Sequence, residues 1–194
     1  MAAKLVYDFT EGDASMAKLL GGKGANLAEM TRAGLPVPPG FTIAAFACNE
    51  YFQGGGFLSA ELMEQVRQAL ARLERAVGRR FGGTEAPLLV SVRSGAAVSM
   101  PGMMDTILNL GLNDETTAGL AAWTGDERFA YDCYRRLLHM YGDVVLGVSA
   151  SRFESILTAK KRKLGLDDDS RLPASALKEV AASYKSLILR ETGR

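Results

Sequence analysis

The sequence has few of the residues that build metal centres and disulfide frameworks. Its two cysteines, Cys48 and Cys133, are far apart and do not form a Cys-x-x-Cys pair. This spacing argues against a disulfide framework and against a zinc site, and it is compatible with the cytosol. The only histidine is His139, and a single histidine provides neither a zinc site nor a catalytic triad. We therefore expect His139 to be structural.

The chain also lacks an excess of either charge. Lys and Arg together number 23 and Asp and Glu number 22, which gives a net charge of +1 over 194 residues. No electrostatic field therefore favours nucleic acid or an anionic membrane as a partner. No stretch reaches the roughly 18 consecutive apolar residues of a membrane span, and the N-terminus lacks the apolar core of a signal peptide. We expect a cytoplasmic globular protein with no nucleic-acid or membrane partner.

The first part of the chain mixes strands with helices. Short apolar or alternating segments predict strands at 5–9, 41–43, 88–92 and 106–110. Helices are predicted at 24–33 and 44–52, and a third is predicted after a capping serine, Ser59, with apolar residues at helical spacing as far as Val77. Residues 1–111 are accordingly expected to form an α/β (α+β) lobe.

The pattern changes after residue 111, where no further strand is evident. Helices are predicted at 114–123, after the capping residue Asp126, at 152–164 and at 175–190. In the second of these helices, five apolar residues recur at helical steps and predict its buried face: Phe129, Cys133, Leu137, Met140 and Val144. Residues 112–194 are expected to form an all-helical subdomain. Because the last helix runs almost to the final residue, we expect the chain to be a piece of a longer protein.

Arg93 follows the apolar strand at 88–92 and precedes a loop rich in small residues. Its planar fork of donors suits phosphate oxygens, and such a loop lets backbone N–H groups approach an anion. A structural salt bridge is an equally good explanation from the residues alone. The loop ends in Ser-Met-Pro-Gly-Met-Met-Asp-Thr at 99–106, where the methionines suit either an adenine pocket or a core gap, with core filling favoured. Asp105 is open to three roles: capping a turn, pairing with Arg93 or lying near a metal.

A second motif is Gly-Gly-Lys-Gly at 21–24. It is not a Walker A loop, because Ala17 stands where that loop needs glycine, and Leu27 excludes a dinucleotide fingerprint. The functional interpretation is that Lys23 reaches a phosphate from a loop before a helix N-terminus, where the helix dipole also favours anions. A flexible turn with a solvated lysine is favoured by the residues alone.

Two arginines, Arg135 and Arg136, stand side by side in the helix after Asp126. Neighbouring helical residues point about 100° apart, so one of them can face solvent while the other reaches toward a cleft. Two solvated or salt-bridged arginines are the favoured interpretation. Arg136 is a weak candidate for an anion contact.

Together, Gly-Gly-Lys-Gly-Ala-Asn-Leu-Ala-Glu-Met at 21–30 and the segment at 99–106 closely resemble the pyruvate, phosphate dikinase family. The resemblance extends to Leu-Pro-Val-Pro-Pro-Gly-Phe at 35–41 and to Met-Tyr-Gly-Asp-Val-Val at 140–145. The first motif is shared with phosphoenolpyruvate synthases and glucan water dikinases, whereas Met-Pro-Gly-Met-Met-Asp-Thr is more specific. One departure is Ala97, where family members often have arginine, so one polar contact near the loop is in doubt.

The resemblance implies the N-terminal lobe of an ATP-grasp nucleotide-binding domain with a helical insert. The family enzyme is a phosphotransferase that converts ATP, phosphate and pyruvate into AMP, pyrophosphate and phosphoenolpyruvate through a phosphohistidine. That histidine lies in a Thr-Ser-His context absent from this chain, so His139 does not correspond to it. The resemblance also implies Mg²⁺ and a pyruvate-binding domain, with the Mg²⁺ ligands expected outside this chain, and a homodimeric full-length protein. The isolated chain is expected to be inactive.

The resemblance further implies the site residues. Lys23 and Arg93 are expected to be catalytic and to contact the ATP phosphates, while Arg136 stays a weak candidate. Further nucleotide contacts are expected from Ser94, Gly102, Met103 and Thr106, and no metal ligand is expected in this chain. Two alternatives are a piece of a phosphoenolpyruvate synthase or other water dikinase, and, from another class, a free-standing nucleotide-binding or interaction module.

Overall fold

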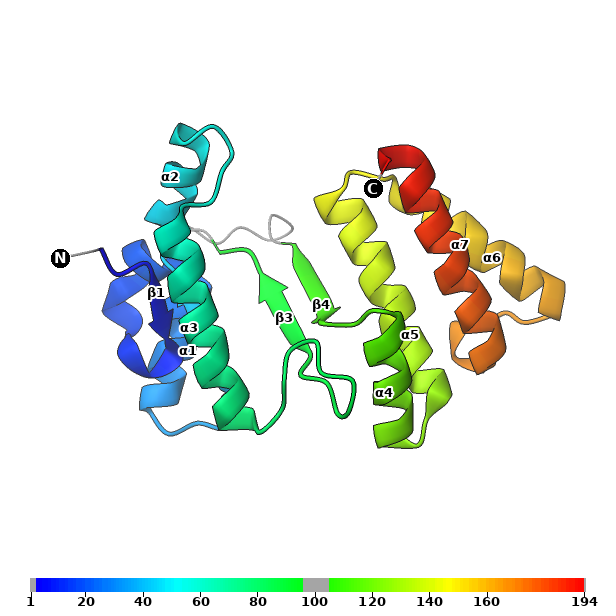
Figure 1. The fold of residues 1–194 in the computed structure, drawn as a ribbon, viewed down its shortest axis with the longest axis horizontal. Helices are drawn as coiled ribbons and strands as arrows, with labels where there is room; N and C mark the ends of the chain where they lie inside the picture. The colour runs from blue at the N-terminus through cyan, green and yellow to red at the C-terminus, as the bar shows by residue number, and fades with distance from the viewer. Residues whose placement is uncertain (1–2, 96–104, 194) are drawn as a thin grey trace. The chain divides into compact units, whose positions relative to one another are not determined.

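The computed structural model describes residues 3–95 and 105–193, and the chain divides into two compact units (Figure 1). One unit is built on the chain up to Gly78. The other is built on Arg79–Arg93 and the chain from Asp105 onward. The strands of the described chain form two antiparallel pairs, and helices make up most of both units. The predicted mixture of α and β structure is confirmed.

The first unit contains a small sheet and three α-helices. Its elements in chain order are β1 (Val6–Asp8), the 3-10 turns Phe9–Glu11 and Ala14–Met16, α1 (Ala17–Arg32), β2 (Phe41–Ile43), α2 (Phe46–Gln53) and α3 (Ala60–Val77). The strands pair antiparallel, with Val6 opposite Ile43. The predicted cap of α3 is confirmed, because the Ser59 side chain accepts a hydrogen bond from the backbone N–H of Leu62. α1 is interrupted at Gly21, so the helical segment that corresponds to the predicted helix at 24–33 begins just after Gly21, and a shorter helical segment from Ala17 precedes it.

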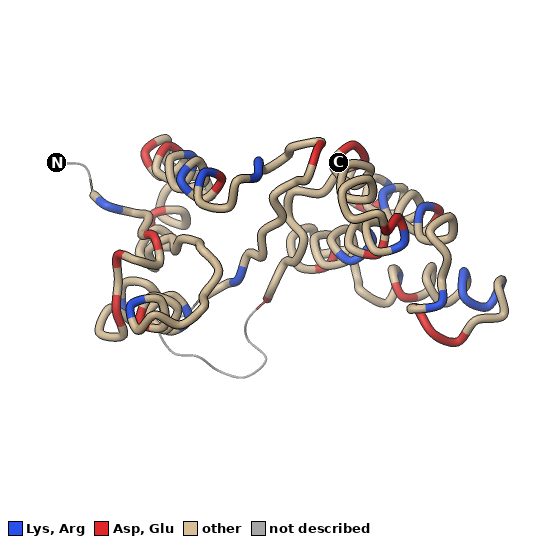
Figure 2. The backbone as a smooth tube through the Cα atoms, turned by 90° about the horizontal axis from the view of Figure 1, so that it is seen from below, with Lys and Arg blue, Asp and Glu red and all other residues tan. Residues whose placement is uncertain are grey.

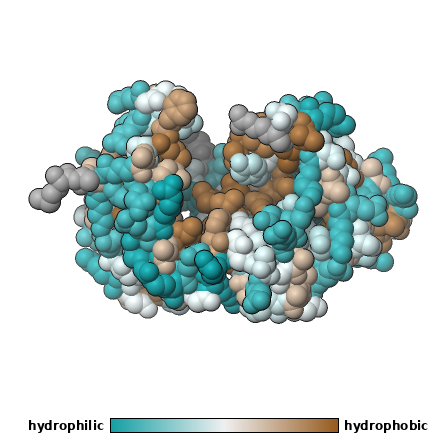
Figure 3. Space-filling view, in the orientation of Figure 1, coloured by the Kyte–Doolittle hydropathy of each residue, from teal (hydrophilic) through white to brown (hydrophobic). Residues whose placement is uncertain are grey.

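Apolar and polar contacts both hold α3 against β1 (Figure 1). One buried apolar cluster of this unit consists of Leu5, Val6, Ala47, Leu62 and Ala69. The side-chain oxygen of Gln65 accepts hydrogen bonds from the backbone N–H groups of Leu5, at 2.7 Å, and Val6, at 3.2 Å. Arg72 pairs with Asp8 at 2.6 Å. The outward face of α3 is mostly hydrophilic, as expected for a helix with one buried side (Figure 3).

Gly24 allows α1 to approach β2 closely. A Cβ atom placed on Gly24 would lie 2.8 Å from Thr42 Cγ2 and 3.2 Å from Leu20 Cβ. The first distance is shorter than real Cβ contacts, so a side chain at this position would force α1 and β2 apart. The glycine beside Lys23 is therefore required by packing, whatever else the motif does.

The second unit is a hairpin followed by helices. Its elements in chain order are β3 (Val90–Arg93), β4 (Thr106–Leu110), α4 (Asp114–Thr124), α5 (Glu127–Met140), the π-helical turn Tyr141–Val145, α6 (Ala150–Leu164), the 3-10 turn Asp169–Arg171 and α7 (Ala174–Thr192). β4 lies against α5, α7 packs on α5, and α6 packs on α7 (Figure 1). The predicted cap at Asp126 is confirmed, and the regular elements described after Gly111 are helical, as predicted. None of the helices described is long and apolar enough to cross a membrane.

Two apolar clusters form the interior of this unit. One joins the hairpin to α5 through Ile107, Leu112, Leu120, Ala130, Tyr134, Leu137 and Ala181. The other joins α6 to α7 through Val148, Phe153, Leu157, Leu172, Ala176, Leu177, Val180, Tyr184, Leu187 and Ile188. The predicted buried face of α5 is wrong in part, because Phe129 is 45% exposed and Val144 is 40% exposed. The buried line runs one residue later, through Ala130 and Tyr134, since α5 packs on α7 as well as on β4.

The hairpin β3–β4 belongs to the same compact unit as the helices from α4 to α7, and β4 packs on α5. The sequence places it in the α/β lobe, with a boundary after Gly111. The division of the chain into an α/β lobe at 1–111 and a helical subdomain at 112–194 stays a prediction. The compact units differ from this division, because β3 and β4 pair with each other and β4 packs on α5, so that the hairpin falls in the same unit as the helices.

We expect the Gly24→Ala substitution to destabilise the first unit. Alanine usually stabilises a helix relative to glycine by about 0.5–1 kcal/mol, but the added methyl group here meets Thr42. Overpacking of this kind lowers the free energy of unfolding by about 1–3 kcal/mol, which urea titration would measure. The control is Asn26→Ala, on the exposed side of α1, with an expected change within about 0.5 kcal/mol. Equal stability of the Gly24→Ala chain and the parent would contradict the tight contact.

Candidate functional site

Lys23 lies inside α1, in the first turn after a break in the helix. At Gly21 the backbone leaves the helical region, with φ of 70° and ψ of 160°. The sequence predicts that Lys23 projects from a loop before a helix; the structure places it within the helix, two residues after the break. The backbone N–H groups that start a helical segment lack partners within it, and such groups favour an anion. Lys23 therefore lies near the start of a helical segment, as the sequence predicts, but within the helix and not in a loop before it.

Lys23 differs from several nearby cations in its charge environment. Lys and Arg positions are interspersed with Asp and Glu positions in both units (Figure 2). In the first unit, Lys4 pairs with Glu11, and Arg32 lies near Asp13 and Glu29. Lys23 is half-buried and forms no ion pair with a carboxylate among residues 3–95 and 105–193. Within the described residues, no carboxylate therefore competes with an external anion for its ammonium group.

Arg93 and Thr106 lie opposite each other at the end of the β3–β4 hairpin. Arg93 is the last residue of β3, and its side chain is exposed. In the described part of the chain, it too forms no ion pair with a carboxylate, so the structural salt bridge considered from the sequence is not seen there. Ser94 follows directly and is exposed. The predicted contacts at Gly102 and Met103 lie outside the described residues.

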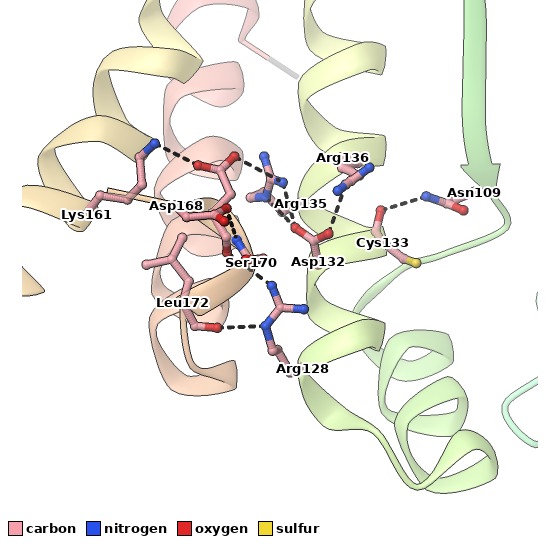
Figure 4. Close-up of polar contacts among 11 residues, drawn as sticks. Asn109, Arg128, Asp132, Cys133, Arg135, Arg136, Lys161, Asp168, Ser170 and Leu172 are labelled. Atoms are coloured by element: carbon pink, nitrogen blue, oxygen red, sulfur yellow. Dashed lines mark hydrogen bonds and ion pairs between the residues drawn. The ribbon is translucent and has the colours of Figure 1, made fainter. Parts of the chain in front are cut away.

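Arg136 is already paired. It is exposed on α5, and its Nε donates to Asp132 at 2.9 Å (Figure 4). Arg135 has a side chain only 6% exposed and contacts the same carboxylate at 2.6 Å and that of Asp169 at 3.9 Å. Both arginines are therefore salt-bridged, as the favoured interpretation of the sequence predicts, with Arg135 buried in an ion-pair network. The sequence carried a signal for this network, since Asp132 stands three and four residues before the two arginines.

The same network reaches the turn before α7. Arg128 donates to the backbone oxygens of Leu172, at 3.0 Å, and Asp169, at 3.1 Å (Figure 4). Lys161 on α6 pairs with the Asp169 carboxylate at 2.8 Å. These contacts join α5, α6 and the 3-10 turn, so this cluster of charged residues is structural. Sequence reasoning did not single out Arg128 or Asp169.

His139 is enclosed by aromatic rings. It stacks on Phe153 with 5.0 Å between ring centroids, and it meets the edge of Tyr184 at 6.0 Å. Burial lowers the pKa of His139 below its ordinary value, although Asp143 and Glu154 act in the opposite direction. This environment favours a neutral imidazole packed as an aromatic ring, which agrees with the structural role expected for His139.

The described residues offer no metal centre. Among residues 3–95 and 105–193, no group of three or more His, Cys, Asp and Glu side chains is placed to hold a metal ion. Both cysteines are free thiols. The Mg²⁺ expected from the family resemblance therefore finds no ligand set in the described part of the chain.

Comparison with known proteins decides the family. A family model described as "Pyruvate phosphate dikinase, AMP/ATP-binding domain" matches residues 17–58 and 55–187. The chain belongs to this family. Lys23 and Arg93 both lie within the matched residues of the pyruvate phosphate dikinase domain, as do Thr106 and Arg136. The resemblance predicted from the motifs is confirmed.

Individual relatives agree with the family assignment. The chain is 55% identical over 185 residues to pyruvate, phosphate dikinase of Clostridium symbiosum, covering 95% of this chain and 21% of the relative. It is 54% identical over 196 residues to the chloroplastic pyruvate, phosphate dikinase of Mesembryanthemum crystallinum, covering 99% of this chain and 20% of the relative. The chain is 53% identical over 190 residues to pyruvate, phosphate dikinase of Rhizobium meliloti, covering 96% of this chain and 21% of the relative. The chain thus spans about a fifth of the length of these relatives.

The two adjacent arginines of the pyruvate phosphate dikinase domain are expected to differ sharply in their effect on stability. Arg135→Ala removes a buried partner of Asp132 and should lower the free energy of unfolding by about 3 kcal/mol or more. Arg136→Ala removes an exposed partner of the same carboxylate and should cost less than about 1 kcal/mol. Thermal and urea unfolding of both variants would measure the difference. Equal losses would mean that Arg135 is not buried in solution.

Proposed function

We propose that this chain supplies the first part of the ATP site of a pyruvate, phosphate dikinase. The proposed reaction converts ATP, phosphate and pyruvate into AMP, pyrophosphate and phosphoenolpyruvate. Membership of the pyruvate phosphate dikinase AMP/ATP-binding family is the observation that carries this proposal. The alternatives of a water dikinase or a free-standing module are not favoured, because the relatives described above are pyruvate, phosphate dikinases.

In this proposal, two cations bind the phosphates of ATP. Lys23 acts as a point charge beside the N–H groups that follow the break at Gly21, and Arg93 offers a planar fork at the end of β3. The exposed position of Arg93 and the absence of a carboxylate partner for either cation in the described chain support these roles. Phosphoryl transfer depends mainly on positioning and on stabilising charge, which is what such cations provide.

The other predicted site residues are proposed to contact the nucleotide, without assignment to its phosphates or its nucleoside. Ser94 and Thr106 carry hydroxyl groups beside Arg93, and the backbone at Gly102 and the side chain of Met103 complete the set. Arg136 is a weaker candidate, because its guanidinium is paired with Asp132. The hydroxyls are close to Arg93 in the chain or across the hairpin, which supports their inclusion.

The rest of the proposed enzyme lies outside this chain. We place the chain in the N-terminal lobe of an ATP-grasp domain within a cytoplasmic, homodimeric protein. The phosphohistidine, the pyruvate site and the ligands of Mg²⁺ belong to other parts of that protein. The packing of His139 against Phe153 and Tyr184 supports a phosphoryl acceptor elsewhere in that protein.

We expect the chain alone to form no phosphoenolpyruvate from ATP, phosphate and pyruvate. Its one histidine is packed among aromatic rings and is not placed as a phosphoryl acceptor. A coupled assay for phosphoenolpyruvate, run with Mg²⁺ and inorganic phosphate, measures this directly. Product formation above the rate without protein would contradict the proposal that the phosphoryl acceptor and the pyruvate site lie outside this chain.

We expect Mg-ATP to perturb the NMR signals of Lys23, Arg93 and their neighbours in the labelled chain. Lys23→Met and Arg93→Met should each weaken the response by about tenfold or more, because each removes a charge-assisted contact to phosphate. The matched controls are Lys18→Met, on α1 before the break, and Arg162→Met, on α6, both exposed. These should leave the titration unchanged.

Two results would contradict the proposed phosphate site. One is a folded chain with no shifts at Lys23 or Arg93 at saturating Mg-ATP. The other is an equal loss of response in the control variants, which would indicate binding governed by net charge alone. Inorganic phosphate and AMP titrations would further separate recognition of the phosphate chain from recognition of the nucleoside.

A further inference from the structure

β4 contains one more residue than β3 between two of their paired positions. Val90 lies opposite Leu110 and Val92 lies opposite Ile107, so two steps along β3 correspond to three steps along β4. An extra residue of this kind is a β-bulge. Asn109 lies within the bulged stretch with φ of 60°, in the left-handed region that glycine, asparagine and aspartate adopt most readily.

The bulge sets which residue lies opposite Arg93. If the pairing of Val90 with Leu110 continued without a bulge, Arg93 would lie opposite Ile107. With the bulge, Arg93 lies opposite Thr106. Residues paired across a sheet share one face, and a slip of one residue moves a side chain to the other face. Because Ile107 is buried against α5 and Arg93 is exposed, the bulge keeps the guanidinium on the face away from the apolar core.

The core itself requires the extra residue. Ile107 and Leu110 both pack into the apolar cluster between the hairpin and α5. Residues three apart in a regular strand point to opposite faces, so both can reach the same cluster only if the alternation is interrupted between them. The bulge at Asn109 provides that interruption, which is a second and independent observation of the same register.

The Asn109 side chain fastens the bulge to α5. Its Nδ2 donates to the backbone oxygen of Cys133 at 3.2 Å (Figure 4). Its own backbone oxygen accepts from the N–H of Leu112 at 3.3 Å. Asparagine therefore meets two needs at this position: it tolerates the left-handed backbone, and it holds β4 against the helix. Glycine would meet only the first of these.

We propose that Asn109 is a positioning residue for Arg93. It holds the bulge in β4, and the bulge sets the register that places Arg93 and Thr106 together on the exposed face of the hairpin. The link to ATP rests on the function proposed above for Arg93. The link to the register does not depend on any nucleotide.

The experiment compares the Asn109→Gly, Asn109→Ala and Asn109→Val chains. Cross-strand NMR contacts are measured without nucleotide for the pairs Val92–Ile107 and Arg93–Thr106. Glycine keeps the left-handed backbone and should preserve both pairs, with faster amide exchange in β4 because the bond to Cys133 is lost. Valine is β-branched and disfavours that backbone, so both pairs should be lost, with alanine intermediate.

Mg-ATP titration of the same chains then tests the consequence for the site. The response at Arg93 should survive in Asn109→Gly and weaken by about tenfold in Asn109→Val, as expected when a charge-assisted contact is misplaced. Leu157→Ala is the control for a purely structural effect. It truncates a buried residue of the cluster between α6 and α7, so it should lower stability while leaving the register and the titration unchanged.

The outcomes separate the two proposals. A folded Asn109→Val chain that keeps both cross-strand pairs would overturn the positioning role of Asn109. If the Asn109→Val chain does not fold, an Asn109→Ala chain that keeps both pairs as strongly as the parent chain would overturn it instead. Loss of nucleotide response in Leu157→Ala equal to that in Asn109→Val would also overturn it. If the parent chain shows the expected register but no response to Mg-ATP, the function proposed for Arg93 fails. The role of Asn109 in the hairpin is then decided by the cross-strand contacts alone, which are measured without nucleotide.

Discussion

The second unit depends on the neutralisation of one buried charge in α5. This helix contacts β4 on one side and α7 on another, and Arg135 on it is only 5% exposed. An unpaired guanidinium in such a place would cost several kcal/mol. Asp132, one turn earlier, offsets that cost, and Asp169 adds a second carboxylate from the turn before α7. The ion pair between Arg135 and Asp132 therefore stabilises the helix on which β4 of the hairpin packs.

The sequence predicted the parts of the fold that local signals control. The starts of α3 and α5 follow from Ser59 and Asp126, since a capping side chain acts within one turn. The buried face of α5 was only partly predictable. Periodicity identifies an apolar face, but α5 packs on both β4 and α7, which changes the face that is buried. Phe129 is therefore exposed and Ala130 is fully buried. Contacts with two partners cannot be derived from the period of one helix.

The residues around the candidate site predicted the family but not the local geometry. The order of residues around Lys23 and Arg93 was enough to identify the family, and the family match confirms it. The break at Gly21 and the bulge at Asn109 were not predicted. Glycine and asparagine permit positive φ values but do not impose them, so the backbone conformation depends on the surrounding core. The sequence of β4 held one unused signal, a polar residue at Asn109 within an apolar strand.

The bulge and the terminal arginine of the hairpin also affect solubility. Each strand of the described chain pairs with one other strand, so each has an edge whose N–H and C=O groups lack a strand partner. Such edges invite pairing with other chains, and natural sheets discourage this with short strands, bulges and charges. The hairpin has all three: β3 is four residues long, β4 is interrupted at Asn109, and Arg93 places a cation at the end of β3. The features that set the position of Arg93 in the hairpin thus also act as barriers to aggregation.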